Sequence, residues 1–338
     1  MLRFFRKIRQ SLFQEKKIAR YLMYAAGEVA LVIIGIMIAV GLNNSNEARK
    51  QDKQIQSILK QIQVELTETI EESNDLIEYF RQKDSLIYLA MKNKVTREAY
   101  EDPNNGALRS IYMNYDQLIL QEDGFNNLMQ KSEIMPDKYL TLVKSLKKLY
   151  INSNDAVKEF NQKLSSLVDD AQAQLRDNYD WYADWAFSGS LNNEMVDYYL
   201  NDIVHKNNLE RYSNIAIGNL TPYIINVRID AIKSIREIDA LLETNNTYSF
   251  DVNGADYADW NGKYHYQGDT LEFANNEDGV RWLNEGEWQE VYPLSSSQFH
   301  YVWGGFCQMT KDENGETDGI KFHLSKINIT YQKIKAND

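Results

Sequence analysis

A single apolar run near the N-terminus constrains this chain more than any other feature. From Leu22 to Leu42 every residue except Glu28 is apolar, small or tyrosine. At about 1.5 Å per residue, a helix of this length covers about 31 Å, enough to cross a hydrocarbon core about 30 Å thick. The part that follows Glu28 covers only about 21 Å, which is too short. We therefore predict a transmembrane helix over residues 21–43 that carries Glu28 inside the membrane.

Two interpretations of Glu28 remain open. In the first, its carboxyl group lies near the inner headgroups or is simply protonated, since a neutral acid needs no counter-ion in a low dielectric. In the second, Glu28 marks a contact between helices, since intramembrane acids tend to face protein. Gly35 follows seven residues later on the same face, and Gly35 with Ala39 forms a small-xxx-small pair that allows close approach of a second helix.

The charges on either side of the run predict its orientation. Residues 1–20 hold seven lysines and arginines against one acid, Glu15, which is a net charge of +6. The positive-inside rule places this end in the cytosol and everything after Asn43 outside, in the periplasm if the membrane is the inner one. The tail can form an amphipathic interfacial helix, and the alternative is that its charges serve only as a topology signal. Cleavage after a small-x-small site at Ala39-Val40-Gly41 is the alternative, but the charged and apolar regions are both long for a signal peptide.

The remaining composition excludes several classes of protein. The whole chain of 338 residues carries a net charge of −12, so the part after the tail is strongly acidic. Such a surface argues against nucleic acid as a partner and leaves membrane lipid and protein, including a homo-oligomer or a membrane protein bound through the span. Cys307 is the only cysteine, so an intrachain disulfide, a zinc–thiolate cluster and a CxxC motif are excluded.

Residues 44–245 have the pattern of a helical bundle. Apolar residues recur at three- and four-residue steps from Ile55 to Met91, with a gap at Ser73-Asn74, and a cluster of breakers follows at 102–106. Further helices are predicted over 108–129 with a possible break at Asp123-Gly124, from Pro136 to about Leu175, over 192–217, and from Thr221-Pro222 to about Thr244.

An aromatic segment, DWYADWAFSGSLN, lies between two of these helices. Its residues Trp181, Tyr182, Trp185 and Phe187 could line a ligand groove. The alternative is that they close one end of a helical core, which is the commoner use of such a cluster.

Residues 246–338 have a different pattern, with alternating and aromatic-rich segments separated by Asn-Gly, Asp-Gly and Glu-Gly pairs. The segments are TYSFDV, GKYHYQ, TLEFA, VRWLN, WQEVYPL, QFHYVW and KINITYQKI. Glycine supplies the positive φ that tight hairpin turns need. We predict about eight antiparallel strands in a meander that closes into a small barrel or a sandwich. The fold class is therefore membrane-anchored α+β: one transmembrane helix, a helical bundle and a β domain.

Two stretches resemble known families. The head, with Phe4-Phe5-Arg6-Lys7-Ile8-Arg9, Tyr24, Gly27-Glu28, Ile34-Gly35-Ile36 and Asn43-Asn44-x-Asn46-Glu47, resembles single-span membrane proteins of Bacteroidota that share a domain of unknown function. Ser45 stands where that family usually has tryptophan, which removes an interfacial anchor. The tail, NGKYHYQGDTLEF to IKFHL, is similar to lipocalin-like accessory domains that follow serine hydrolases. These resemblances imply an envelope protein and no assigned activity.

No catalytic constellation accompanies the β domain. The chain lacks G-x-S-x-G, S-x-x-K, a Walker loop and H-E-x-x-H. The four histidines have no short spacing typical of a metal site, and KDENGETDG has its glycines at the wrong places for an EF-hand. We expect no cofactor, no metal and no enzymatic activity. The sequence favours a membrane-tethered envelope protein that acts by binding or assembly; the alternative is a ligand-sensing ectodomain that signals through a membrane partner.

Overall fold

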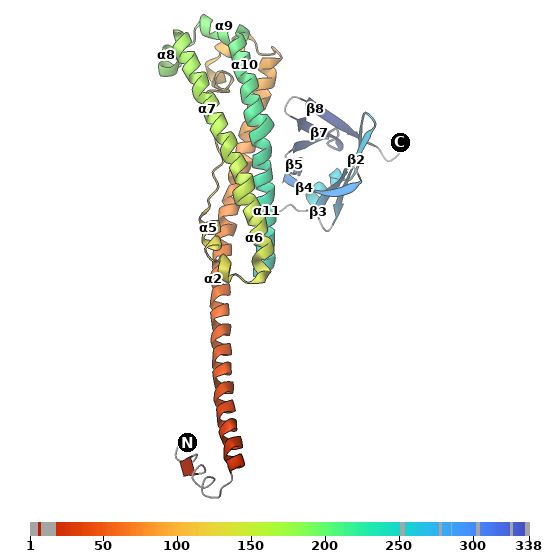
Figure 1. Cartoon of the computed structure of the whole chain (residues 1–338). Coiled ribbons are helices and arrows are strands. Elements are labelled where there is room, and N and C mark those ends of the chain that lie inside the picture. Colours follow the sequence, from red (N-terminus) through yellow and green to blue (C-terminus); the bar gives the residue numbers. More distant parts are fainter. Residues whose placement is uncertain are drawn as a thin grey trace. The chain divides into compact units, whose positions relative to one another are not determined.

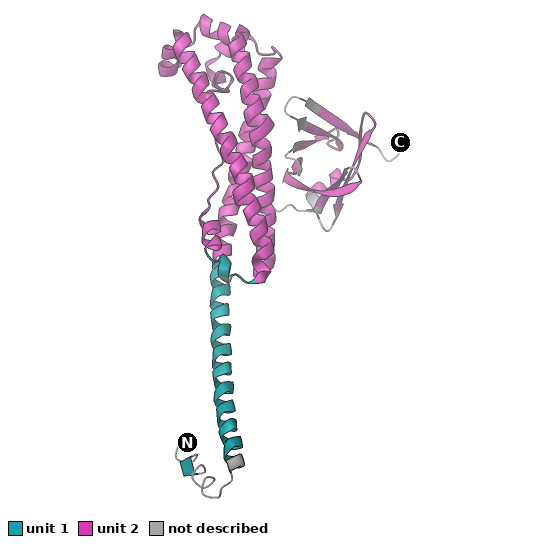
Figure 2. Cartoon of the chain, in the orientation of Figure 1, with its two compact units in different colours: residues 1–57, 131–136 teal, residues 58–130, 137–338 magenta. Residues whose placement is uncertain are grey.

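A computed structural model describes residues 6–7, 18–250, 254–276, 279–284, 286–301, 305–324 and 327–334. The chain divides into two compact units, one of residues 1–57 with 131–136 and one of residues 58–130 with 137–338 (Figure 2). Most of the tail helix predicted over residues 1–20 lies outside the described residues.

The longest element is α2 (Ile18–Met91), a helix of 74 residues. Among the described residues it is the one helix long and apolar enough to cross a membrane. Its first part leaves large apolar side chains exposed, namely Leu22, Met23, Val29, Leu31, Val32, Ile33, Ile34, Ile36, Met37, Ile38, Val40 and Leu42.

The second part of α2 buries one face, as its three- and four-residue period predicts. The buried residues are Ile55, Leu59, Ile62, Leu66, Ile70, Leu76, Ile77, Phe80 and Ile87. The helix ends at Met91, before the predicted breaker cluster at 102–106. Asn93 then takes a left-handed backbone conformation with φ of 52°, which turns the chain.

The other helical elements follow α2 in a bundle, in which α2, α7 and α11 run side by side (Figure 1). They are α3 (Arg97–Glu101), η1 (Pro103–Asn105), α4 (Gly106–Arg109), α5 (Asp123–Met129), η3 (Asp137–Tyr139), α6 (Leu140–Lys147), η4 (Lys148–Ser153), α7 (Asn154–Asn178), α8 (Trp181–Ser188), α9 (Asn193–Asn201), α10 (Ile203–Tyr212), η5 (Ser213–Leu220) and α11 (Thr221–Leu242). Of the remaining short helices, η2 (Ser132–Ile134) belongs to the first unit, and η6 (Gly254–Trp260) precedes the strands.

The helix predicted over 108–129 is wrong in its middle. Residues 114–122 have no regular secondary structure and form an extended segment, here called the strap, between α4 and α5. Two carbonyls of the strap accept hydrogen bonds from side chains of helices that are distant in sequence. Lys83 Nζ donates to Asn114 O at 2.7 Å, and Asn161 Nδ2 donates to Leu118 O at 3.0 Å. These bonds replace those that a helix would make within itself.

The α-helix α11 starts at Thr221-Pro222 as predicted, but it is not a separate helix, because the π-helix η5 runs into it and the chain is helical without a break from Ile203 to Leu242. Pro222 has no N–H and would leave a carbonyl of a preceding α-helix without a donor. The turn before it is instead the π-helix η5, and Thr221 Oγ1 donates to Ala216 O at 2.7 Å. The helix predicted over 192–217 is interrupted at Asp202, which has extended backbone and caps Val204 N.

The C-terminal part is a closed barrel of eight antiparallel strands in the order β1 to β8. The strands are β1 (Gly262–Tyr266), β2 (Asp269–Asn276), β3 (Gly279–Asn284), β4 (Glu287–Ser295), β5 (Gln298–Tyr301), β6 (Gly305–Lys311), β7 (Thr317–Leu324) and β8 (Ile327–Lys333). Pairing of Tyr264 with Lys333 joins β1 to β8 and removes both sheet edges. The predicted meander is confirmed, although residues 247–250 of its first expected strand are not extended in a sheet.

The interior of the barrel is filled by its own side chains. Tyr264, Phe273, Trp282, Phe299 and Phe322 point into one buried cluster, which Tyr257 and Trp260 of η6 complete. Eight strands enclose a space just wide enough for such side chains. The structure is therefore a packed β domain that follows a helical bundle.

Candidate functional site

The three residues predicted to form a helix–helix contact in the membrane, Glu28, Gly35 and Ala39, lie on one side of α2. At 100° per residue, Gly35 and Ala39 are each within about 20° of the direction of Glu28. Glu28 is half-buried, and Gly35 and Ala39 are exposed. A Cβ built on Gly35 would meet no atom within 4 Å, so this face has room for a second helix. The contact itself stays a prediction.

The four aromatic residues predicted to line a groove do not share one environment. Trp181 is 3% exposed and packs against Tyr179, Tyr198 and Tyr199, whereas Phe187 is 95% exposed. Tyr182 and Trp185 are half-buried and contact each other with ring centroids 5.8 Å apart. The structure thus brings Trp181 into the core of the bundle and separates Phe187 from it.

A hydrogen-bonded chain continues inward from these rings. Tyr198 and Tyr112 join their hydroxyls at 2.9 Å, and Tyr112 OH lies 2.9 Å from His205 Nδ1. Burial lowers the pKa of His205 to about 3, so the imidazole is neutral near pH 7. No group of three or more histidine, cysteine, aspartate or glutamate side chains with metal-binding geometry exists among the described residues.

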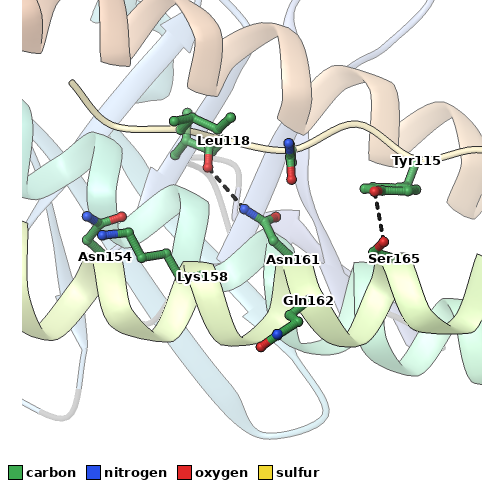
Figure 3. Close-up of a pocket in the computed structure, with 9 residues that line it drawn as sticks. Tyr115, Leu118, Asn154, Lys158, Asn161, Gln162 and Ser165 are labelled. Carbon is green, nitrogen blue, oxygen red and sulfur yellow. Dashed lines mark hydrogen bonds between the residues drawn. The ribbon is translucent and has the colours of Figure 1, made fainter.

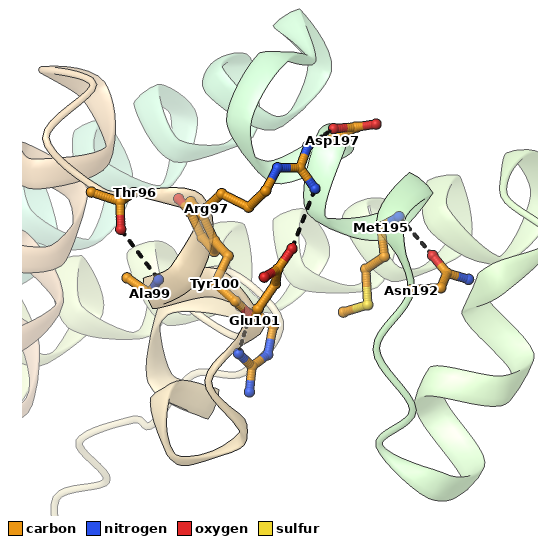
Figure 4. Close-up of polar contacts among 9 residues, drawn as sticks. Thr96, Arg97, Ala99, Tyr100, Glu101, Asn192, Met195 and Asp197 are labelled. Carbon is orange, nitrogen blue, oxygen red and sulfur yellow. Dashed lines mark hydrogen bonds and ion pairs between the residues drawn. The ribbon is translucent and has the colours of Figure 1, made fainter.

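Near this cluster, exposed ion pairs and helix caps stabilise the short helices α3 and α9 (Figure 4). Arg97 of α3 forms ion pairs with Glu101 of its own helix and with Asp197 of α9. Thr96 and Asn192 cap α3 and α9 with hydrogen bonds to Ala99 N and Met195 N. The pair of Arg97 with Asp197 joins the two short helices, and each of the five side chains has a structural partner.

A further candidate is a cleft between the strap and α7, here called the strap cleft (Figure 3). Its volume is about 310 Å³, and it is lined by Tyr115, Gln117, Leu118 and Ile119 of the strap and by Asn154, Lys158, Asn161, Gln162 and Ser165 of α7. Side chains tie the strap to α7 at three points. Asn161 Nδ2 donates to Leu118 O, Tyr115 OH donates to Ser165 Oγ at 2.9 Å, and Glu122 Oε1 accepts from Asn154 Nδ2 and Lys158 Nζ.

Two asparagines in the wall each keep an oxygen without a donor. Asn154 is 1% exposed and Asn161 is 7% exposed, and the Oδ1 atom of each has no hydrogen-bond partner among the described residues. Their amide orientations are set by their nitrogens, since Nδ2 of Asn154 donates to Glu122 and Nδ2 of Asn161 donates to Leu118 O. A buried acceptor without a donor costs about 1–3 kcal/mol, so both positions call for an explanation.

The strap cleft is nearly neutral. Lys158 Nζ lies 2.6 Å from Glu122 Oε1, so the one ionisable amine in the lining already has a counter-ion. The lining contains no histidine, cysteine or carboxylate, and its other polar groups are amides and hydroxyls. This arrangement suits hydrogen bonding to a ligand and supplies no nucleophile paired with a base.

No family model, curated protein or solved structure matches this chain. The resemblances to the Bacteroidota membrane proteins and to lipocalin-like domains therefore stay predictions.

Sequence reasoning missed the strap cleft because it assigned a helix to the strap. One signal was present. Asn154 and Asn161 lie seven residues apart, in line with the buried Val157, Leu164 and Val168 of α7. Amides that recur at core positions of an amphipathic helix indicate that something polar must meet that face.

Proposed function

We propose that this protein is a membrane-tethered envelope protein that acts by binding or assembly and not by catalysis. The observation that carries the proposal is the exposed apolar part of α2 from Leu22 to Leu42. A continuous apolar surface of that size needs a membrane or a protein to cover it. Its length matches one crossing of a bilayer.

The charge asymmetry supports the direction of crossing. The basic tail stays in the cytosol, and the bundle and the barrel lie in the periplasm, on the outer side of the inner membrane. Membrane lipid is then the first partner. A second copy of the chain or another membrane protein binds through the face of Glu28, Gly35 and Ala39.

A second candidate function is ligand sensing, which the strap cleft favours. The cleft provides a polar site in the bundle, and α2 continues from the predicted span into the buried face of that bundle. A sensor of this design passes its signal through the span to a membrane partner.

The topology can be tested with a reporter enzyme that is active only outside the cytosol. Fused after Asp338, alkaline phosphatase should be active, and fused near Lys17 it should be inactive. A cytosolic reporter at the same two positions should give the opposite result. Activity of the periplasmic reporter at Lys17 and its absence at Asp338 would reverse the orientation and remove the basis of this proposal.

A further inference from the structure

We propose that the strap cleft binds a small neutral ligand rich in hydroxyl groups, about the size of a disaccharide. The inference deepens the ligand-sensing candidate and rests on it, but it does not depend on which side of the membrane the bundle occupies. Four features of the cleft carry it: its unpaired acceptors, its dimensions, its charge and the way its strap is held.

The acceptors define what the ligand must offer. Oδ1 of Asn154 and Oδ1 of Asn161 need hydrogen-bond donors, and both nitrogens of these amides are already engaged. The ligand therefore presents O–H or N–H groups at two separate points. Gln117, Gln162 and Ser165 in the same lining can each donate and accept, as a hydroxyl group also does.

The dimensions define its size. Seven residues along α7 separate the two asparagines, which is about 10.5 Å at helical rise. A ligand that reaches both must be about two sugar rings long. The cleft volume of about 310 Å³ is at the lower end for small-molecule sites, which excludes a folded partner or a long polymer from its interior.

The charge excludes ionic ligands. An anion would need a cation that has no other partner, and Lys158 is paired with Glu122. A divalent metal would need several carboxylates, and the lining has none. Amide and hydroxyl groups beside the exposed side chain of Ile119 match a neutral ligand that has both hydroxyls and apolar C–H faces.

The strap gives the ligand a route to the buried acceptors. Across the cleft, the bonds from Asn161 to Leu118 O and from Tyr115 to Ser165 tie the strap to α7. A ligand hydroxyl that replaces either of these bonds separates the strap from α7 in the middle of the cleft and reaches Oδ1, while Glu122 still holds the end of the strap through Asn154 and Lys158. The strap is thus the part of the cleft that moves when the ligand enters.

The test uses the full chain reconstituted in lipid nanodiscs without any glycoside detergent. Saturation-transfer difference NMR follows binding of two probes, cellobiose and N,N′-diacetylchitobiose, with inorganic phosphate as an anionic comparison. We expect saturable binding of at least one disaccharide and none of phosphate. Asn154→Leu and Asn161→Leu should each weaken that binding about tenfold, the effect of one lost hydrogen bond.

Two further variants separate ligand contacts from folding. Gln162→Trp places an indole in the cleft from an exposed position of α7 and should abolish binding while the melting temperature is unchanged. Asn178→Leu, at the exposed far end of the same helix, is the matched control and should bind like the wild type. The proposal is overturned if neither disaccharide binds saturably, if Gln162→Trp binds as well as the wild type, or if phosphate binds in their place.

Discussion

His205 is buried as a neutral imidazole, whereas in the unfolded chain the same side chain becomes protonated at mildly acidic pH. Its folded pKa is about 3, lowered by burial from an ordinary value of 6.5, with Asp202 and Lys206 as the nearby charges. Between these two values the unfolded chain binds a proton that the folded chain does not. The contribution of His205 to stability is therefore complete above about pH 6.5 and falls as the pH is lowered toward 3.

We expect His205→Gln to reduce this dependence. The stability difference between wild type and variant should shrink by about 3 kcal/mol from pH 7 to pH 4, at about 1.4 kcal/mol per pH unit below 6.5. Urea denaturation of both chains at a series of pH values, followed by circular dichroism, measures it. Carboxylates that titrate in the same range are common to both chains and cancel. Parallel pH curves would show that folding does not change the pKa of His205, which would contradict its burial as a neutral side chain.

Gly124, which follows the strap, packs closely against α2, and its replacement tests that packing. A Cβ there would lie 2.7 Å from Glu65 Oε2 and 2.7 Å from Ile62 Cγ1, while Gly124 N donates to Glu65 Oε1 at 3.0 Å. We expect Gly124→Ala to lower the free energy of unfolding by about 1–3 kcal/mol through overpacking. Gly106→Ala is the control, because its helical φ of −52° and open surroundings should make it neutral or slightly stabilising. Equal effects of the two substitutions would contradict the close packing at Gly124.

At the scale of elements, α2 carries the predicted helix–helix contact. Membrane hydrogen bonds contribute about 0.6–2 kcal/mol, and small residues let backbones approach closely. In a peptide of residues 20–47, Glu28→Gln should preserve self-association in bilayers because the amide keeps the hydrogen bond. Glu28→Leu should weaken self-association, and Gly35→Leu should weaken it more. The dimer fraction, measured by energy transfer between labelled peptides, distinguishes these results.

Gly41→Leu is the matched control for this contact, since Gly41 is also surrounded by open space but lies about 120° from Gly35 around the helix. It should leave the dimer fraction unchanged. If Glu28→Leu and Gly35→Leu also leave it unchanged, α2 is only an anchor and Glu28 is a carboxyl near the inner headgroups.

At the scale of the whole molecule, the barrel is a candidate for independent folding. Every strand from β1 to β8 pairs with two neighbours inside the barrel, and its buried cluster comes from those strands and η6. Residues 247–338 made alone should give a β-type circular dichroism spectrum and one cooperative melt. A shorter fragment that ends before β8 should lose the cooperative melt, because β1 loses a partner. A soluble 247–338 fragment without a cooperative transition would contradict this independence.

Much of the architecture could be predicted from the sequence because its causes are local. The apolar residues of the α2 run follow one another with the single interruption of Glu28. The buried residues from Ile55 to Ile87 recur every three or four positions. In the barrel, apolar and polar residues alternate along each segment, and turns that contain glycine separate the segments. Each of these patterns is complete within a short window. The predicted change of pattern near Asn245 lies between the end of α11 at Leu242 and the start of β1 at Gly262.

The strap and its cleft were decided only by the tertiary structure. The strap has the composition of a helix, but two of its carbonyls, those of Asn114 and Leu118, accept from Lys83 and Asn161, which lie 31 and 43 residues away from the groups they bind. No local window contains those donors. The same packing turns the two asparagines of α7 from ordinary helix residues into buried acceptors, because burial is a property of what lies opposite and not of the helix itself.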